Sequence, residues 1–144
     1  MDEYKEITIL LVESDNSGEK LGGLLKEFSK ENKMDTLIFE TENKLLNFLK
    51  SNTNYREFKM HYMVVFNIKP PLDNLIKVIS QIKEDQSLKC IPIFLITLSI
   101  DDEDIIKSYN SYLNCYIVKP KDMKGLIQVV NTFKIFWLDI ATLP

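Results

Sequence analysis

The sequence predicts an α/β fold in which one doubly wound parallel sheet is covered by helices on both faces. Two observations carry this prediction: short apolar runs alternate with amphipathic stretches along the chain, and several runs are apolar at nearly every position. A continuous apolar run is typical of a parallel strand that is buried on both faces. The composition agrees, because 144 residues with 45% hydrophobic and 27% charged content suffice for one domain with a sizeable core.

Five apolar runs rich in β-branched and aromatic residues are predicted to form the strands. They cover residues 7–12, 36–39, 62–66, 91–96 and 115–118. The first, third and fourth runs lack the alternation of a half-exposed strand, so they should lie in the interior of the sheet.

Apolar residues at helical spacing separate the strands and should face the sheet. The stripes are Leu21, Leu24, Leu25 and Phe28; Leu45, Leu46 and Leu49; Leu72, Leu75, Ile76 and Ile79; and Leu126, Val129, Val130 and Phe133. Thr41 and Asp73 are placed to cap the second and third of these helices, and Ser99 is placed to begin a further helix before the fifth strand. Gly22 and Gly23 should each weaken the first helix by about 1 kcal/mol, which close packing on the sheet would explain.

Five β-α units predict a five-stranded sheet with five helices, right-handed crossovers and the flavodoxin-like order 2-1-3-4-5. We expect a single domain over residues 1–144, with an extended C-terminal helix and tail.

Charge and hydropathy argue against nucleic acids and membranes as direct binding partners. The net charge of −3 comes from interspersed residues without a basic block, so direct nucleic-acid binding is not expected. The N-terminal stretch is acidic and no segment approaches membrane-spanning length, so we expect a cytoplasmic protein that does not bind membranes. Cys90 and Cys115 lack metal-ligand spacing and are expected to be small buried thiols.

Polar residues follow the predicted strands at the edge where parallel α/β sheets place their functional crevice. Glu13, Ser14 and Asp15 follow the first strand, Asn67 the third, Thr97 the fourth and Lys119 the fifth. These side chains are expected to converge.

Three of the segments around these positions resemble motifs of response-regulator receiver domains. They are Ile-Leu-Leu-Val-Glu at 9–13, Ile-Pro-Ile-Phe-Leu-Ile-Thr at 91–97 and Cys-Tyr-Ile-Val-Lys-Pro at 115–120, and residues 136–144 resemble the ending of single-domain regulators that partner cyanobacterial phytochromes. In that family an acidic pair and a third-strand aspartate hold Mg²⁺, and the aspartate accepts phosphate from a histidine kinase. The resemblance implies a stand-alone, non-enzymatic receiver in two-component phosphorelay signalling.

Two positions depart from the family pattern. Ser14 stands where the second acid is expected and Asn67 where the phosphoacceptor is expected, whereas Glu13 matches. An amide has no anionic oxygen for attack on phosphorus, and a hydroxyl is a poor ligand for a hard dication. We therefore expect phosphorylation to fail and Mg²⁺ binding to be lost or weak. Asp15 either turns inward as a partial substitute or helps to cap the first helix.

The resemblance assigns further roles on the fourth and fifth strands. Thr97 and Tyr116 match the family's switch pair, although both are also good strand residues. Lys119 matches the phosphate contact, and we expect it either to pair with Glu13 or to donate to the amide oxygen of Asn67; the alternative is that it points into solvent.

The C-terminal segment is too aromatic for one sheet-facing stripe. Phe133, Phe136, Trp137 and Ile140 are the predicted partner interface. The segment either folds back over its own domain or meets another subunit, and we expect a homodimer.

Three functions follow. The first is a pseudo-receiver that binds a histidine kinase or a downstream signalling protein without phosphorylation. The second is an active phosphorelay receiver with an unconventional acceptor, which would be Asp73, Asp15 or a deamidated Asn67. The third is a small flavodoxin-like enzyme or ligand-binding module, although the sequence contains no glycine-rich phosphate loop.

Overall fold

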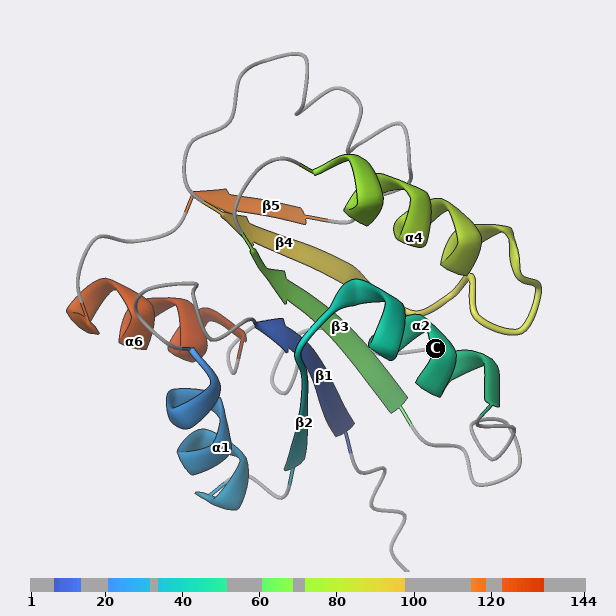
Figure 1. Ribbon diagram of the computed structural model, residues 1–144. Coiled ribbons are helices and arrows are strands. Elements are labelled where there is room, and N and C mark those ends of the chain that lie inside the picture. Colours follow the sequence, from blue (N-terminus) through green and yellow to red (C-terminus); the bar gives the residue numbers. More distant parts are fainter. Residues whose placement is uncertain are drawn as a thin grey trace, which may run out of the picture.

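A parallel sheet forms the centre of the computed structural model, which describes residues 7–13, 21–31, 34–51, 61–68, 72–97, 115–118 and 123–133. Its strands lie side by side in the order β2-β1-β3-β4-β5 and all pair in parallel (Figure 1). Their bounds are Ile7–Glu13 (β1), Met34–Phe39 (β2), His61–Asn67 (β3), Ile93–Thr97 (β4) and Cys115–Val118 (β5). The predicted parallel α/β architecture is confirmed.

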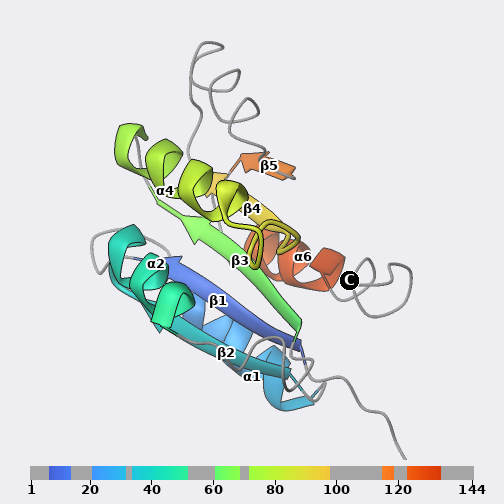
Figure 2. The same cartoon turned by 90° about the vertical axis from the view of Figure 1, so that its right-hand side faces the viewer.

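Helices cover both faces of the sheet, as predicted. Figure 2 shows α2 and α4 on one face and α1 and α6 on the other. Their bounds are Gly22–Glu31 (α1), Glu42–Ser51 (α2), Asp73–Glu84 (α4) and Met123–Phe133 (α6). The helix predicted to begin at Ser99 and the tail after Phe133 lie outside the described residues. None of the helices in the described part of the chain has the length and apolar character needed to span a bilayer.

Each face of the sheet has its own apolar core. Alternate residues of a strand point to opposite faces, so Leu10 and Val12 pack under α2 and α4 while Ile9 and Leu11 pack under α1 and α6. The predicted stripes supply the buried helical residues Leu21, Leu25, Phe28, Leu45, Leu46, Leu49, Leu72, Leu75, Ile79 and Val130. Leu24, Ile76 and Val129 are partly buried, and the side chains of Leu126 and Phe133 lie outside the described part.

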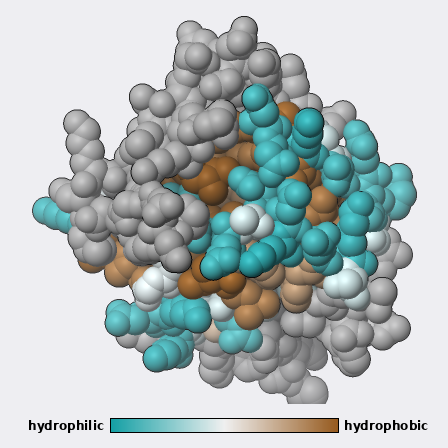
Figure 3. All heavy atoms as spheres, in the orientation of Figure 1, coloured by the Kyte–Doolittle hydropathy of each residue, from teal (hydrophilic) through white to brown (hydrophobic). Residues whose placement is uncertain are grey.

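The interior strands are buried on both faces, which confirms the interpretation of their continuous apolar runs. Residues Ile9 to Val12 of β1 have no exposed surface. By contrast, β2 is an edge strand, and its Leu37 and Ile38 are 41% and 43% exposed. Hydrophilic side chains cover much of the outer surface over α2 and α4 (Figure 3).

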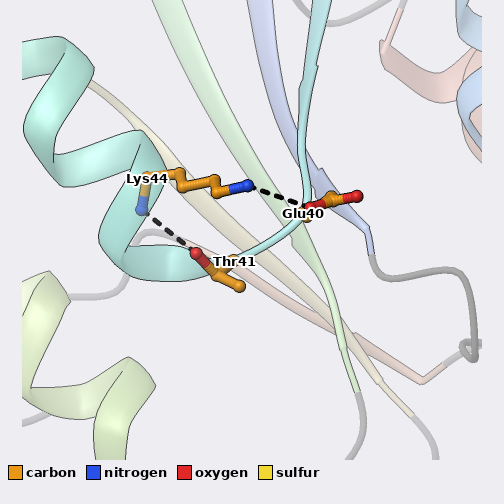
Figure 4. A network of polar contacts seen from close by, with 3 residues as sticks. All are labelled: Glu40, Thr41 and Lys44. Atoms are coloured by element: carbon orange, nitrogen blue, oxygen red, sulfur yellow. Dashed lines mark hydrogen bonds and ion pairs between the residues drawn. The ribbon is translucent and has the colours of Figure 1, made fainter.

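The predicted cap at Thr41 is confirmed. Its hydroxyl oxygen accepts the backbone N–H of Lys44 at 3.2 Å, and the Lys44 ammonium pairs with Glu40 at 3.0 Å across the same turn (Figure 4). Both members of this ion pair are exposed, so the hydroxyl cap contributes more to the helix start than the pair does.

The predicted cap at Asp73 is wrong. The N-cap of α4 is Leu72, which makes no side-chain capping bond, and Asp73 is the first helical residue. The Leu72 side chain is buried in the core. Asp73 instead places its negative charge in the first turn, where the helix dipole favours it.

The prediction of a buried Cys90 is also wrong. Cys90 is a free, exposed thiol in the turn before β4, and the side chain of Cys115 lies outside the described part. The neighbouring Ile91 and Pro92 are buried, but the backbone turns here, with the N–H of Ile91 donating to the carbonyl of Leu88 at 3.1 Å. A residue in such a turn need not share the direction of its apolar neighbours.

Candidate functional site

The carboxyl ends of the two central strands bring Glu13 and Asn67 together. They are the last residues of β1 and β3, and the parallel register places them opposite each other. Both side chains are buried, with 5% and 1% of the residue surface exposed. By strand alternation Glu13 shares the α1 and α6 face with Ile9 and Leu11, so its carboxylate is directed toward the start of α1.

Three N–H groups donate to the Glu13 carboxylate. The backbone N–H of Leu21 donates to Oε2 at 2.6 Å, the backbone N–H of Gly22 donates to Oε1 at 2.9 Å, and Nδ2 of Asn67 donates to Oε2 at 2.6 Å. The first N–H groups of a helix have no partner within it and carry partial positive charge. The buried anion is therefore stabilised by dipoles at the start of α1 and by a neutral amide.

The carboxylate also dictates how the Asn67 amide is turned. An ionised carboxylate only accepts hydrogen bonds, so it selects the NH₂ group of the neighbouring amide and not its carbonyl oxygen. Asn67 consequently serves as a hydrogen-bond donor at the end of β3. An aspartate in its place would put two carboxylates in contact within a buried site.

Gly22 makes the short approach of α1 to Glu13 possible. A Cβ atom at position 22 would lie 2.7 Å from Cδ1 at the end of the Ile38 side chain and 3.0 Å from Oε1 of Glu13, so both neighbours would have to shift. A Cβ atom at Gly23 would meet nothing within 4 Å. Close packing, predicted for both glycines, is confirmed for Gly22 alone.

Comparison with known proteins finds similar sequences and structures among the response regulators. No protein-family model matches the chain. Response regulator Rcp1 of Synechocystis sp. is 29% identical over 138 residues, which cover 94% of this chain and 92% of Rcp1. The crystal structure of Mn²⁺-bound Rcp1 superimposes with a TM-score of 0.72 at 28% identity, covering 95% of this chain and 98% of that one. The phosphorylated cyanobacterial phytochrome response regulator RcpA gives 0.76 at 26% identity, covering 95% and 97%.

The chain is homologous to Rcp1, and its structural neighbours are response-regulator receiver domains. The resemblance seen in the sequence motifs is thus confirmed.

The structure describes only some of the other residues that match the receiver motifs. Thr97 ends β4, where it pairs with Val118, and Tyr116 lies in β5 opposite Leu95; the side chains of Thr97 and Tyr116 lie outside the described part. Ser14, Asp15 and Lys119 also lie outside the described residues, so the contact expected between Lys119 and Glu13 stays a prediction.

The partner interface predicted for the receiver homologue is likewise untested. Phe133 is the last residue of α6, and Phe136, Trp137 and Ile140 fall beyond the described residues. Within the described ranges, no group of three or more His, Cys, Asp or Glu side chains could hold a metal ion.

Sequence reasoning missed two parts of this site. It did not predict the amide and the two backbone N–H groups that donate to Glu13, while the contact of Lys119 with Glu13 or with the Asn67 amide oxygen stays a prediction. It also gave Gly22 no connection to Glu13. The adjacent glycines at the start of a helix that follows a strand-ending acid were the available signal, because glycine permits close backbone approach.

Proposed function

We propose that this receiver homologue is a pseudo-receiver, which signals through protein contacts without an aspartyl phosphate. The observation that carries the proposal is the 2.6 Å hydrogen bond from Asn67 Nδ2 to Glu13 Oε2. This bond occupies the place where the family resemblance expects a carboxylate to receive the phosphoryl group.

The donor set does not fit a hard dication. Mg²⁺ and Mn²⁺ take oxygen ligands, and an amide nitrogen that already donates a hydrogen bond cannot serve as one. Both oxygens of Glu13 accept N–H bonds from α1 or Asn67, and these bonds would have to break before a metal could bind. Rcp1 has been crystallised with Mn²⁺, so its site provides the contrast.

The phosphoryl-transfer step lacks its nucleophile for a related reason. A carboxylate can attack phosphorus because it carries an anionic oxygen, whereas the Asn67 side chain is neutral and its nitrogen lone pair is delocalised into the amide. With neither cation nor nucleophile, the site serves as a permanent clamp between β1, β3 and α1. Such a clamp favours one conformation of the receiver, which a partner protein can recognise constitutively.

The partner is a histidine kinase or a downstream signalling protein in the cytoplasm, and the chain forms a homodimer through Phe133, Phe136, Trp137 and Ile140. Sedimentation of the full chain beside a version truncated after Lys134 tests the dimer. The full chain should have a dimeric mass and the truncated chain a monomeric one. A monomeric mass for both would end this part of the proposal.

Acetyl phosphate with Mg²⁺ tests the loss of phosphorylation. Intact-mass measurement should detect no phosphoryl adduct on the wild-type chain. The double variant Ser14→Asp/Asn67→Asp should acquire one, because it restores both missing carboxylates. Asn47→Asp is the matched control, since it makes the same chemical change on the exposed surface of α2. A stable phosphoryl adduct on the wild-type chain, at Asp73 or elsewhere, would contradict the proposal.

A further inference from the structure

A second polar cluster lies at the opposite end of the sheet, in the turn between α4 and β4. Nζ of Lys83 donates to the backbone carbonyl of Lys89 at 3.0 Å and to that of Ile91 at 2.5 Å. These two carbonyls flank Cys90, which is a free and exposed thiol. The side-chain amine of α4 is therefore held against the short stretch of backbone that carries the thiol.

The turn that presents Cys90 is held in place on both sides. Oδ1 of Asp85 accepts the backbone N–H of Ser87 at 2.8 Å and its hydroxyl at 2.7 Å, while the N–H of Lys89 donates to the Asp85 carbonyl at 2.9 Å. Leu88 and Ile91 are buried in the core beside this turn. The backbone that carries Cys90 is consequently held next to the Lys83 amine, which lowers the entropic cost of a reaction between the two residues.

Burial makes the Lys83 ammonium group easier to deprotonate than that of an exposed lysine. Burial is the larger influence on the pKa of its ammonium group and lowers it, and the charge of the Cys90 thiolate partly opposes this change. The hydrogen bonds of Nζ to the carbonyls on either side of Cys90 place the two residues next to each other. A neutral amine has two N–H bonds, which the two carbonyls can accept, and a lone pair that remains available for attack. Acylation needs that lone pair.

We propose that Cys90 and Lys83 form an acyl-acceptor site that is modified by small thioesters. The Cys90 thiolate attacks the thioester carbonyl carbon; a new carbon–sulfur bond forms at Cys90, the carbon–sulfur bond to the donor breaks, and the donor leaves as a thiolate. The Lys83 amine then attacks the Cys90 thioester, a carbon–nitrogen bond forms, and the amine proton passes to sulfur. Cys90 is regenerated as a thiol and Lys83 is left as an amide, with no oxidant or reductant required.

Acylation changes the turn that it modifies. The amide on Lys83 keeps one N–H in place of two, so one of the carbonyls of Lys89 and Ile91 loses its donor. That turn leads into β4, where the Pro92 carbonyl accepts the N–H of Val64 at 3.0 Å. The modification therefore loosens the amino-terminal entry to the sheet and leaves the Glu13 site untouched.

Acetyl-coenzyme A is the probe for the test. The full chain is incubated with it, and the acetylation rate of each lysine is measured by peptide mass mapping. Lys83 should be acetylated about tenfold faster than the exposed Lys77 and Lys89, and Cys90→Ser should remove this advantage without changing the other two rates. Lys83→Arg should leave an acetyl group on Cys90 that hydroxylamine releases. Lys77→Arg is the matched control and should leave the Lys83 rate unchanged.

The proposal fails if Lys83 reacts no faster than Lys77, or if Cys90→Ser leaves the Lys83 rate unchanged. Circular dichroism of each variant verifies that the fold is retained, and Cys90→Ser, at an exposed position, should leave it intact. None of these results depends on the state of Asn67.

Discussion

The two ends of the sheet hold buried charge in complementary ways. At the carboxyl end, the Glu13 anion accepts hydrogen bonds from three N–H donors. At the opposite end, the half-buried Lys83 donates to two backbone carbonyls. The hydrogen-bond partners described for these two groups are backbone dipoles and one amide, and none of them is a side chain of opposite charge.

The difference between the ends lies in how completely each is closed. Glu13 and Asn67 are almost fully buried, so the carboxyl end is suited to holding one conformation. Lys83 is only half-buried and stands beside an exposed thiol, so the other end remains open to reagents. In this receiver homologue we therefore expect structural changes to have the greatest effect at the carboxyl end and chemical modification to occur at the other.

Removing the acid should produce the largest loss of stability. Glu13→Ala leaves two backbone N–H groups and the Asn67 amide without their acceptor in a buried site, and we expect the free energy of unfolding to fall by about 3 kcal/mol. Urea denaturation measures the change, with Glu27→Ala on the exposed face of α1 as the control. Equal effects of the two substitutions would mean that the buried carboxylate contributes little.

Replacing the amide by an acid should cost less and should depend on pH. Asn67→Asp places two carboxylates in contact, which raises the pKa of the introduced carboxyl and lowers the free energy of unfolding by about 2 kcal/mol near neutral pH. Because its pKa is raised in the folded state, the introduced carboxyl is tolerated in acid, where it is protonated and can donate to Glu13. Stability is lost as the pH rises through that raised pKa. Urea denaturation on both sides of the transition tests this, and Asn47→Asp should show no such dependence.

The two adjacent glycines offer a matched pair. Gly22→Ala forces a Cβ atom against Ile38 and Glu13 and should destabilise the chain by about 1 to 2 kcal/mol. Gly23→Ala has open space and should stabilise it by as much as about 1 kcal/mol, because alanine favours a helix. Thermal denaturation of the two variants compares them directly. Shifts of the same sign would contradict the close approach at Gly22.

The smallest effect is expected at Lys83. Since its pKa is lowered by burial, the unfolded chain keeps the Lys83 proton at alkaline pH when the folded chain has lost it, so this group makes stability rise with pH. Lys83→Arg stays charged in both states and lacks that rise. The difference between wild type and variant in unfolding free energy should therefore grow between about pH 7 and about pH 10, but stay below about 1 kcal/mol because solvent screens the half-buried group. Urea denaturation at the two pH values measures it, and a constant difference would contradict a lowered pKa.

Sequence alone predicted the sheet and the meeting of Glu13 with Asn67, because parallel strands end at one edge and apolar runs reveal which strands are interior. It could not predict the three hydrogen bonds to Glu13. These depend on how α1 enters the core, which Gly22 permits only through its lack of a side chain. The hydrogen bonds of Lys83 could not be predicted either. A lysine near the end of a helix is normally exposed, and the sequence does not show that the following turn places backbone carbonyls beside it. The burial of Cys90 was predicted wrongly because the hydropathy of its neighbours does not show in which direction a side chain points within a turn.

Magnesium titration followed by nuclear magnetic resonance tests the central claim most directly. The side-chain NH₂ resonances of Asn67 report on its hydrogen bond to Glu13. We expect these resonances to keep their positions in the wild-type chain as Mg²⁺ is added, while the Ser14→Asp/Asn67→Asp variant shows saturable shifts of the Glu13 backbone resonance. Saturable shifts of the wild-type Asn67 resonances on addition of Mg²⁺ would show that the metal breaks the hydrogen bond from Asn67 to Glu13. That result would contradict a permanently clamped site.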